Sequence, residues 1–184
     1  MDISNIDPWV DLAPSNADTM KLNKLRQQIK KKKPWAYRQM AKRYEHGDGV
    51  KQSLQKTINN YLKGAKLGDP ICMHEYGYRL IQGSGICKDI NKKMTAKVTK
   101  IALKHYQKAS QIGYARAQCS LGNCYRDGVG VKKSNSKARE WFNRAAAQDD
   151  EEAIAILKLL DLLEEREKAE EEKKESGGKK ATKE

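Results

Sequence analysis

The stretch YRDGVGVKKS, residues 125–134, places two glycines around a valine and follows them with two lysines. The same arrangement occurs as YEHGDGVKQS at residues 44–53 and, in weaker form, as LIQGSGICKD at residues 80–89. A pattern that returns three times in one chain indicates repeated architecture and not a single active site. A phosphate-binding loop is disfavoured, because neither a preceding strand nor a Gly-Lys-Ser/Thr ending accompanies the glycines.

Segments on both sides of these glycine pairs carry apolar residues at helical spacings. The first pair is preceded by Met40, Ala41 and Tyr44, and it is followed by an apolar stripe that runs from Leu54 to Ala65. Spacings of three and four place such side chains on one face of an α-helix. We therefore predict that each repeat is a pair of antiparallel helices, joined by a turn in which glycine adopts positive φ angles. The predicted turn glycines are Gly47, Gly49, Gly83, Gly85, Gly128 and Gly130.

A small residue recurs at one position of the predicted first helices. Ala41, Gly77 and Gly122 occupy this position in the three repeats. A residue with little or no side chain allows a neighbouring helix to approach closely. We expect the second helix of each repeat to pack against this position.

The second repeat is longer than the others by nine residues, which we place at residues 91–99. Met94, Val98, Ile101 and His105 follow one another at spacings of three and four. This periodicity predicts that the insertion lengthens the second helix by about two and a half turns, at 3.6 residues per turn. A disordered loop is the competing interpretation, since the insertion also contains lysines and small residues.

The regions outside the repeats differ in composition. A leading basic helix is expected at residues 17–33, after the helix-capping residue types Ser15, Asn16 and Asp18. Residues 1–16 are expected to be disordered. The repeat domain is predicted at 34–163, as repeats 34–69, 70–113 and 114–150 with a capping helix at 151–163. Residues 164–184 are of mixed charge and predict a helical extension followed by a disordered tail.

Residues 115–150, ARAQCSLGNCYRDGVGVKKSNSKAREWFNRAAAQDD, resemble the Sel1-like repeat, a relative of the tetratricopeptide repeat. That family's pattern has Leu-Gly-x-x-Tyr, then Gly-x-Gly-Val, Lys-Ala and Trp-Tyr-x-Lys-Ala-Ala, and this stretch follows it with few departures. The resemblance extends over residues 35–150. It implies an all-α fold, a right-handed α/α solenoid of about three Sel1-like helix-turn-helix repeats with a leading and a capping helix, because such units are stable only when stacked.

The resemblance also implies a function. Members of this family act as adaptors, including one that serves ubiquitin-linked degradation, so we expect a non-enzymatic scaffold that binds a protein or peptide through its concave face. By similarity to tetratricopeptide repeats, the first helices line that face. The expected partner-binding residues are basic and polar with one tyrosine, and suit an acidic peptide: Arg38, Lys42, His74, Tyr78, Asn123 and Arg126. Ordinary surface positions are the alternative interpretation of the same residues.

A basic segment supports a second hypothesis. Residues 20–44 contain ten lysines and arginines and no acid, including the basic patch Lys30, Lys31, Lys32 and Lys33. Such a segment neutralises phosphates regardless of sequence, which favours an RNA- or ribosome-associated factor. A solvated helix end before Pro34 explains the same lysines, and base stacking would require exposed aromatic residues near them.

Catalysis, metals and cofactors have no support in the sequence. The three histidines lie at different repeat positions, and His105 occupies the position of Trp141, which indicates a packing role. Cys119 and Cys124 are five residues apart and no Cys-x-x-Cys occurs, so buried free thiols are expected and a zinc site is not. Since no apolar run approaches about 18 residues and no signal peptide is evident, we expect a cytoplasmic or nuclear protein.

Overall fold

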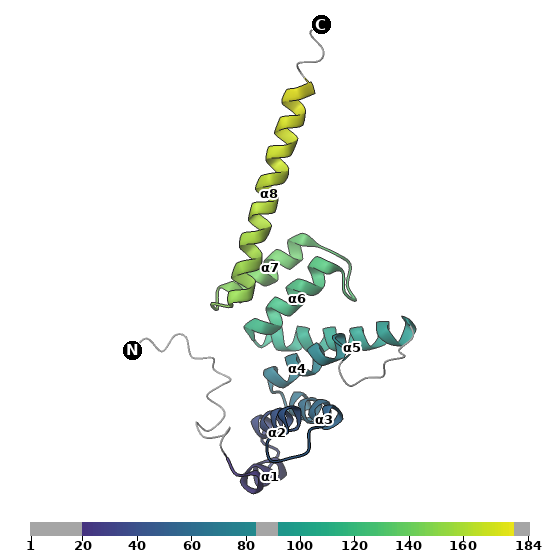
Figure 1. Ribbon diagram of the computed structural model, residues 1–184, viewed down its shortest axis with the longest axis vertical. Coiled ribbons are helices and arrows are strands. Elements are labelled where there is room, and N and C mark those ends of the chain that lie inside the picture. The colour runs from purple at the N-terminus through teal and green to yellow at the C-terminus, as the bar shows by residue number, and fades with distance from the viewer. Residues whose placement is uncertain (1–19, 84–91, 179–184) are drawn as a thin grey trace, which may run out of the picture.

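The computed structural model describes residues 20–83 and 92–178, in which all regular secondary structure is helical. Helices α2 to α7 pack as three consecutive pairs, and each pair packs on the next (Figure 1). This arrangement confirms the predicted α solenoid. The helices are α1 (Leu22–Lys30), α2 (Pro34–His46), α3 (Leu54–Lys66), α4 (Pro70–Ile81), α5 (Lys92–Gln111), α6 (Ala115–Asp127), α7 (Asn135–Ala146) and α8 (Glu151–Gly178).

The turns between paired helices have the geometry that their glycines predict. Gly128 follows α6 with a φ of 74°, in the left-handed region that residues with a Cβ atom avoid. Ser134 then caps α7, since its hydroxyl accepts a hydrogen bond from the Lys137 amide at 3.3 Å. Gly85 lies outside the described residues. The other predicted turn glycines also have positive φ angles, which confirms their assignment: Gly47, Gly49, Gly83 and Gly130.

The paired helices approach closely where the sequence places a small residue. A Cβ atom added to Gly122 would lie 2.6 Å from Cε1 of Phe142 on α7. One added to Gly77 would lie 2.9 Å from Cε1 of Tyr106 on α5. The predicted close approach is confirmed at both positions, and the aromatic ring of the second helix fills the space that glycine leaves.

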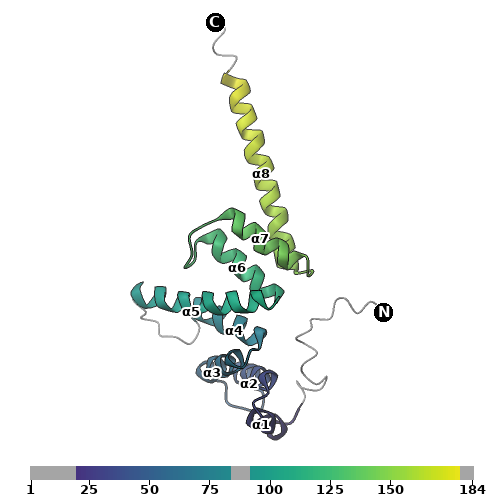
Figure 2. The same cartoon turned by 180° about the vertical axis from the view of Figure 1, so that it is seen from behind.

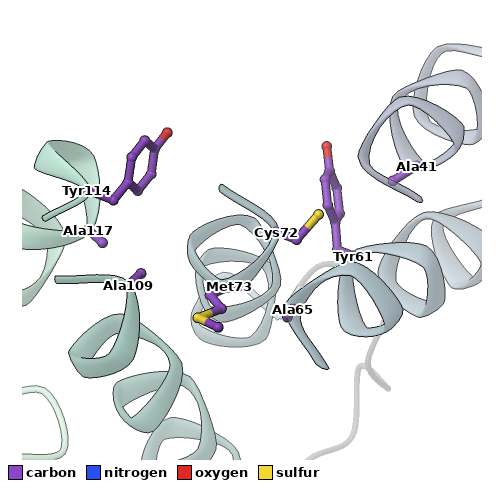
Figure 3. Close-up of a cluster of buried hydrophobic side chains, with 8 residues drawn as sticks. All are labelled: Ala41, Tyr61, Ala65, Cys72, Met73, Ala109, Tyr114 and Ala117. Carbon is purple, nitrogen blue, oxygen red and sulfur yellow. The ribbon is translucent and has the colours of Figure 1, made fainter. Parts of the chain in front are cut away.

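A hydrophobic core continues from one repeat to the next. Helix α4 contributes Cys72 and Met73 to the cluster drawn in Figure 3. Tyr61 and Ala65 of α3 lie on one side of α4, and residues of α5 and α6 lie on the other (Figure 3). Since each helix pair covers the apolar face of its neighbour, no repeat has to bury its own core alone.

The insertion in repeat two forms the first part of a continuous 20-residue helix, α5, which confirms the helical prediction. The apolar stripe is not the predicted one, because Ile101 is 40 % exposed whereas Ala102, Leu103 and Tyr106 are buried. The side chain of Met94 lies outside the described part. The packing of Tyr106 on Gly77 fixes which face of α5 is buried. Leu103 also supports the next repeat, since it closely contacts the turn at Gly130.

The leading helix is shorter than predicted. It begins at Leu22 and ends at Lys30, and its N-cap residue, Lys21, makes no capping side-chain hydrogen bond. The expected capping residues Ser15, Asn16 and Asp18 lie outside the described residues. Leu25 is fully buried against Trp35 and its neighbours, so packing on α2 holds this helix in place.

Helix α8 covers the end of the stack and then continues beyond it (Figures 1 and 2). Ala153 is buried against α7, and Ile156, Leu157 and Leu160 pack partly on the same cluster. From Asp161 to Glu170 every side chain is exposed, including Leu162 and Leu163. Arg139 on α7 forms ion pairs with Asp161 and Glu164 and thereby links α7 to the exposed part of α8.

Candidate partner-binding groove

A groove with a volume of about 1550 Å³ runs between α4 and α6, the first helices of repeats two and three. We call it the α4–α6 groove. Tyr106 of α5 and the turn that leads into α8 also line it. Its walls combine aliphatic, aromatic and charged side chains; the residues used below are Ile71, His74, Glu75, Tyr78, Ile112, Tyr114, Arg116, Ser120, Asn123, Arg126, Asp127 and residues 149–152.

Four of the six predicted partner-binding residues line this groove: His74, Tyr78, Asn123 and Arg126. Arg38 and Lys42 do not. Arg38 is 5 % exposed and lies 3.8 Å from Asp69, whose carboxylate accepts the Cys72 amide hydrogen bond at the start of α4. It stabilises the junction of repeats one and two, which corrects its sequence-based assignment. Lys42 is exposed on α2, away from the groove.

His74 lies at the floor of the groove, where it is 7 % exposed. Its ring stacks on Tyr106 at a centroid distance of 5.5 Å and meets Tyr114 edge to face at 5.6 Å. Tyr78 continues the row of rings at 6.3 Å and is itself 45 % exposed. The buried rings form a rigid aromatic floor, and Tyr78 is the member of the row that a partner can reach.

The ring nitrogens of His74 connect the two first helices. Nε2 lies 3.0 Å from Oγ of Ser120 on α6, and Nδ1 lies 3.3 Å from Oε1 of Glu75. Serine, histidine and carboxylate occur in this order in hydrolases, but those sites also hold a developing oxyanion with free N–H donors. Ser120 lies in the middle of α6, where backbone amides are bonded within the helix. The contact therefore fits an inter-repeat link better than a catalytic site.

Several carboxylates of the groove have partners. Burial by itself would raise the pKa of Glu75, but its hydrogen bond with His74 and the charges of Arg79 and Arg116 outweigh burial and lower it. Asp127 pairs with Arg126 at 2.8 Å, and this pair lowers the pKa of the Asp127 carboxyl. Asn123 donates a hydrogen bond to Glu152 at 3.3 Å. Asn123 and Arg126, two predicted binding residues, thus already contact acids.

Sequence reasoning missed much of the groove. Arg116 and Ser120 lie on the same face of α6 as Asn123, at spacings of four and three, and that spacing could have identified them. The acidic run Asp149–Glu152 is plain in the sequence, but its position at the groove follows only from how α8 folds back on α7. The expectation of an acidic partner rested on Arg38, Lys42 and Arg126, and two of these lie outside the groove.

The basic patch is a separate surface. Lys30 to Lys33 are all exposed, at the end of α1 and in the turn that follows it. The nearby aromatic residues are used by the fold: Trp35 is buried, and the Tyr37 hydroxyl donates to the Ile29 carbonyl at 3.3 Å. Within the described residues, the patch therefore offers positive charge without a free aromatic ring on which bases would stack.

The thiols lie in the core, as the sequence predicts. Cys72, Cys119 and Cys124 are buried and free, and Cys87 lies outside the described residues. Within residues 20–83 and 92–178, no three histidine, cysteine or acidic side chains are grouped so as to hold a metal ion. Over the same residues, no helix combines the length and apolarity needed to cross a bilayer.

Comparison with known proteins places the repeats in a family. The Sel1 repeat profile matches residues 36–69, 70–114 and 115–150. A Sel1 repeat protein from Oxalobacter formigenes has a crystal structure that matches 74 % of this chain and 96 % of that one, at a TM-score of 0.64 and 29 % identity. A protective antigen of uropathogenic Escherichia coli, which has an SLR fold, matches 73 % of this chain and 27 % of its own, at a TM-score of 0.64 and 26 % identity.

Two curated eukaryotic proteins are also similar in sequence. An F-box protein of Arabidopsis thaliana is 32 % identical over 107 residues, which are 57 % of this chain and 26 % of the relative. The chitin synthase regulator SKT5 of Saccharomyces cerevisiae is 29 % identical over 122 residues, which are 65 % of this chain and 16 % of the relative. The chain thus spans about a quarter or less of the length of these relatives.

Proposed function

This chain belongs to the Sel1 repeat family, and on that premise we propose that it is a non-enzymatic adaptor that binds a segment of a partner protein in the α4–α6 groove. Sel1 repeat proteins are generally non-catalytic scaffolds. The observation that carries the proposal is the groove itself, in which the exposed ring of Tyr78 lies beside a rigid aromatic floor. Tyrosine contributes strongly to protein interfaces, because it offers a large apolar area and a polar end.

The name of one relative suits an adaptor. SKT5 of Saccharomyces cerevisiae is named as a regulator of an enzyme, chitin synthase. A similar role here would join this chain to a multiprotein complex in the cytoplasm or nucleus. The comparisons do not test the ubiquitin-linked complex or the acidic partner that the sequence led us to expect.

Site-specific crosslinking tests the proposal. A photoreactive amino acid, p-benzoylphenylalanine, replaces Tyr78 in the groove or, as a control, Lys97, which is exposed on α5 outside the groove. We expect discrete crosslinked protein adducts from position 78 in native lysate, and a different, weaker pattern from position 97. Identical adducts at both positions, or none at position 78, would count against the groove as the binding surface.

The alternative function is RNA or ribosome binding through residues 20–44, and the observation that favours it is the row of exposed lysines at Lys30–Lys33. Replacing these four lysines with glutamine removes the positive patch and leaves the groove unchanged. If the alternative holds, association with ribosomes or RNA falls steeply in the variant and with added salt. Nuclease treatment of the lysate separates this outcome from protein binding, since crosslinks at position 78 would persist.

A further inference from the structure

The α4–α6 groove has a charge opposite to that of the whole chain. The chain has a formal net charge of +13, yet six carboxylate side chains and only two guanidinium groups line the groove. Helices α3 and α5 contain no acidic residue at all. Acidic side chains are therefore concentrated at the groove and around α8, and the surfaces of the second helices in repeats one and two are basic.

The carboxylates without partners gather at one position, the turn that leads into α8. Four acids follow one another here, from Asp149 to Glu152. Asp150 caps α8 by accepting the Ala153 amide hydrogen bond at 3.0 Å, and Glu152 accepts a hydrogen bond from Asn123. The side chains of Asp149 and Glu151 are exposed, and neither carboxylate forms a hydrogen bond or ion pair within the described part of the chain. Arg126, which is already paired with Asp127, also interacts electrostatically with Glu152 in this run.

Aromatic and aliphatic side chains lie in the same groove as these acids. Tyr78 presents an exposed ring, and Ile71 and Ile112 add aliphatic surface. A guanidinium or ammonium group binds well where it can lie over a tyrosine ring and also meet a carboxylate. A contact between a guanidinium group and a tyrosine ring already occurs within the chain, because the Arg79 guanidinium lies 5.3 Å from the centroid of the Tyr61 ring.

We infer that the α4–α6 groove binds a basic peptide segment, whose arginine or lysine side chains meet the carboxylates of Asp149 and Glu151 and whose apolar side chains cover Tyr78 and the isoleucines. This inference rests on the proposed function and adds to it the chemical class of the partner. An acidic peptide or a nucleic acid would bring like charges to the four acids at the turn, which is unfavourable. Arg116, which is exposed in the groove and interacts electrostatically with Glu75, would repel a basic peptide and therefore opposes this binding.

Substitutions at this turn can remove negative charge while keeping the fold. Asp149 has a φ of 60°, in the left-handed region, and the first two repeats have Gly68 and Gly113 at the corresponding position. Asp149→Gly therefore removes a carboxylate and relieves backbone strain. Glu151→Gln keeps nearly the same side-chain volume on an exposed position. The matched control is Glu165→Gln with Glu167→Gln, which makes an equal charge change on the exposed part of α8, outside the groove.

The test measures fluorescence anisotropy with three fluorescein-labelled twelve-residue peptides. All share the same leucines and glycines, and the remaining positions are arginine, glutamine or glutamate. At 50 mM NaCl we expect the arginine peptide to bind more tightly than the other two peptides. Its binding should become weaker at 300 mM NaCl, because salt screens exposed charges. Non-specific attraction does not explain such binding, because the chain as a whole has the same sign of charge as this peptide.

The variants test whether the arginine peptide binds in the groove. The double variant Asp149→Gly with Glu151→Gln should lower the affinity for the arginine peptide about fivefold. This is the loss expected when two exposed charge pairs are removed. The control variant should change its affinity less than twofold, and Arg116→Gln should strengthen it. Thermal unfolding of each variant verifies that the fold is retained.

Three results would overturn the inference: tighter binding of the glutamate peptide, equal affinity of the arginine peptide for the groove and control variants, or no binding of any peptide. The proposed function is judged separately, by crosslinking at position 78. If position 78 crosslinks a partner protein and the glutamate peptide binds most tightly, the groove is a binding site and only the class of partner is wrong.

Discussion

Nε2 of His74 on α4 lies 3.0 Å from Oγ of Ser120 on α6, which links the first helices of repeats two and three across the floor of the groove. The two residues are 46 positions apart in the chain. The contact therefore joins two repeats across the floor of the groove, in addition to the hydrophobic packing between them.

Ser120→Ala tests this link. The substitution leaves Nε2 of the buried His74 without its hydroxyl partner, which should lower the free energy of unfolding by about 1–3 kcal/mol. Chemical denaturation measures the change, and Ser136→Ala, at an exposed position of α7, is the control. Equal stability of the two variants would contradict the link, as would covalent labelling of Ser120 by a fluorophosphonate.

Gly122→Ala tests the close packing of α6 on α7. Alanine favours a helix over glycine by about 1 kcal/mol, but its methyl group would lie 2.6 Å from Cε1 of Phe142. We expect overpacking to dominate, with a net loss of about 1–3 kcal/mol in chemical denaturation. Adding Phe142→Leu to Gly122→Ala should recover part of the loss, whereas additive losses would show that the two residues do not compete for space.

His105 should make stability depend on pH. Burial lowers its pKa below 6.5, and the charges of Lys108 and Lys104 lower it further, while its ring packs edge to face on Tyr76. The pKa of His105 is lower in the folded protein than in the unfolded chain, so folding favours the neutral ring. The resulting stabilisation is complete above pH 6.5 and is lost as the pH falls from 6.5 to the pKa of the folded protein. His105→Phe should flatten the dependence of the unfolding free energy between pH 7.5 and 5, whereas substitution of the exposed His46 should not.

The core thiols should be unreactive in the folded protein. Burial raises the pKa of Cys124 to about 11 and that of Cys72 well above its usual value, so few thiolates form at neutral pH. Brief iodoacetamide treatment followed by peptide mapping should modify Cys72, Cys119 and Cys124 only in denaturant. Rapid modification of any of these three in native buffer would mean that its repeat opens readily.

Limited proteolysis tests the extended α5. Lys97 and Lys100 lie on a helix whose Thr99 and Leu103 pack against the turn at Gly130, so trypsin should cut there slowly. Lys173 lies in the part of α8 that continues beyond the stack, and we expect cleavage there first. Time-resolved mass spectrometry gives the order, and early cuts at Lys97 or Lys100 would favour a loosely packed insertion.

Local patterns in the sequence were sufficient to predict the elements. The Gly-x-Gly turns, the apolar spacings and the small residues at Gly77 and Gly122 each depend on contacts within one helix pair. The length of α5 was also predictable from periodicity, but its buried face was not. That face depends on the fit of Tyr106 against Gly77, and Ile101 has the right spacing but points away from this contact.

The sequence by itself determined that this chain is a stack of three helix pairs, because every repeat carries the turn and packing residues that its own pair requires. Only the tertiary structure decided which side chains a partner can reach. Arg38 is buried where Asp69, the N-cap residue of α4, lies against it, and the groove is acidic because α8 folds back and places Asp149 and Glu151 beside α6. The physical reason is that the rotation of one repeat relative to the next decides which side chains line the groove between them. The spacing of residues within a single helix does not encode that rotation.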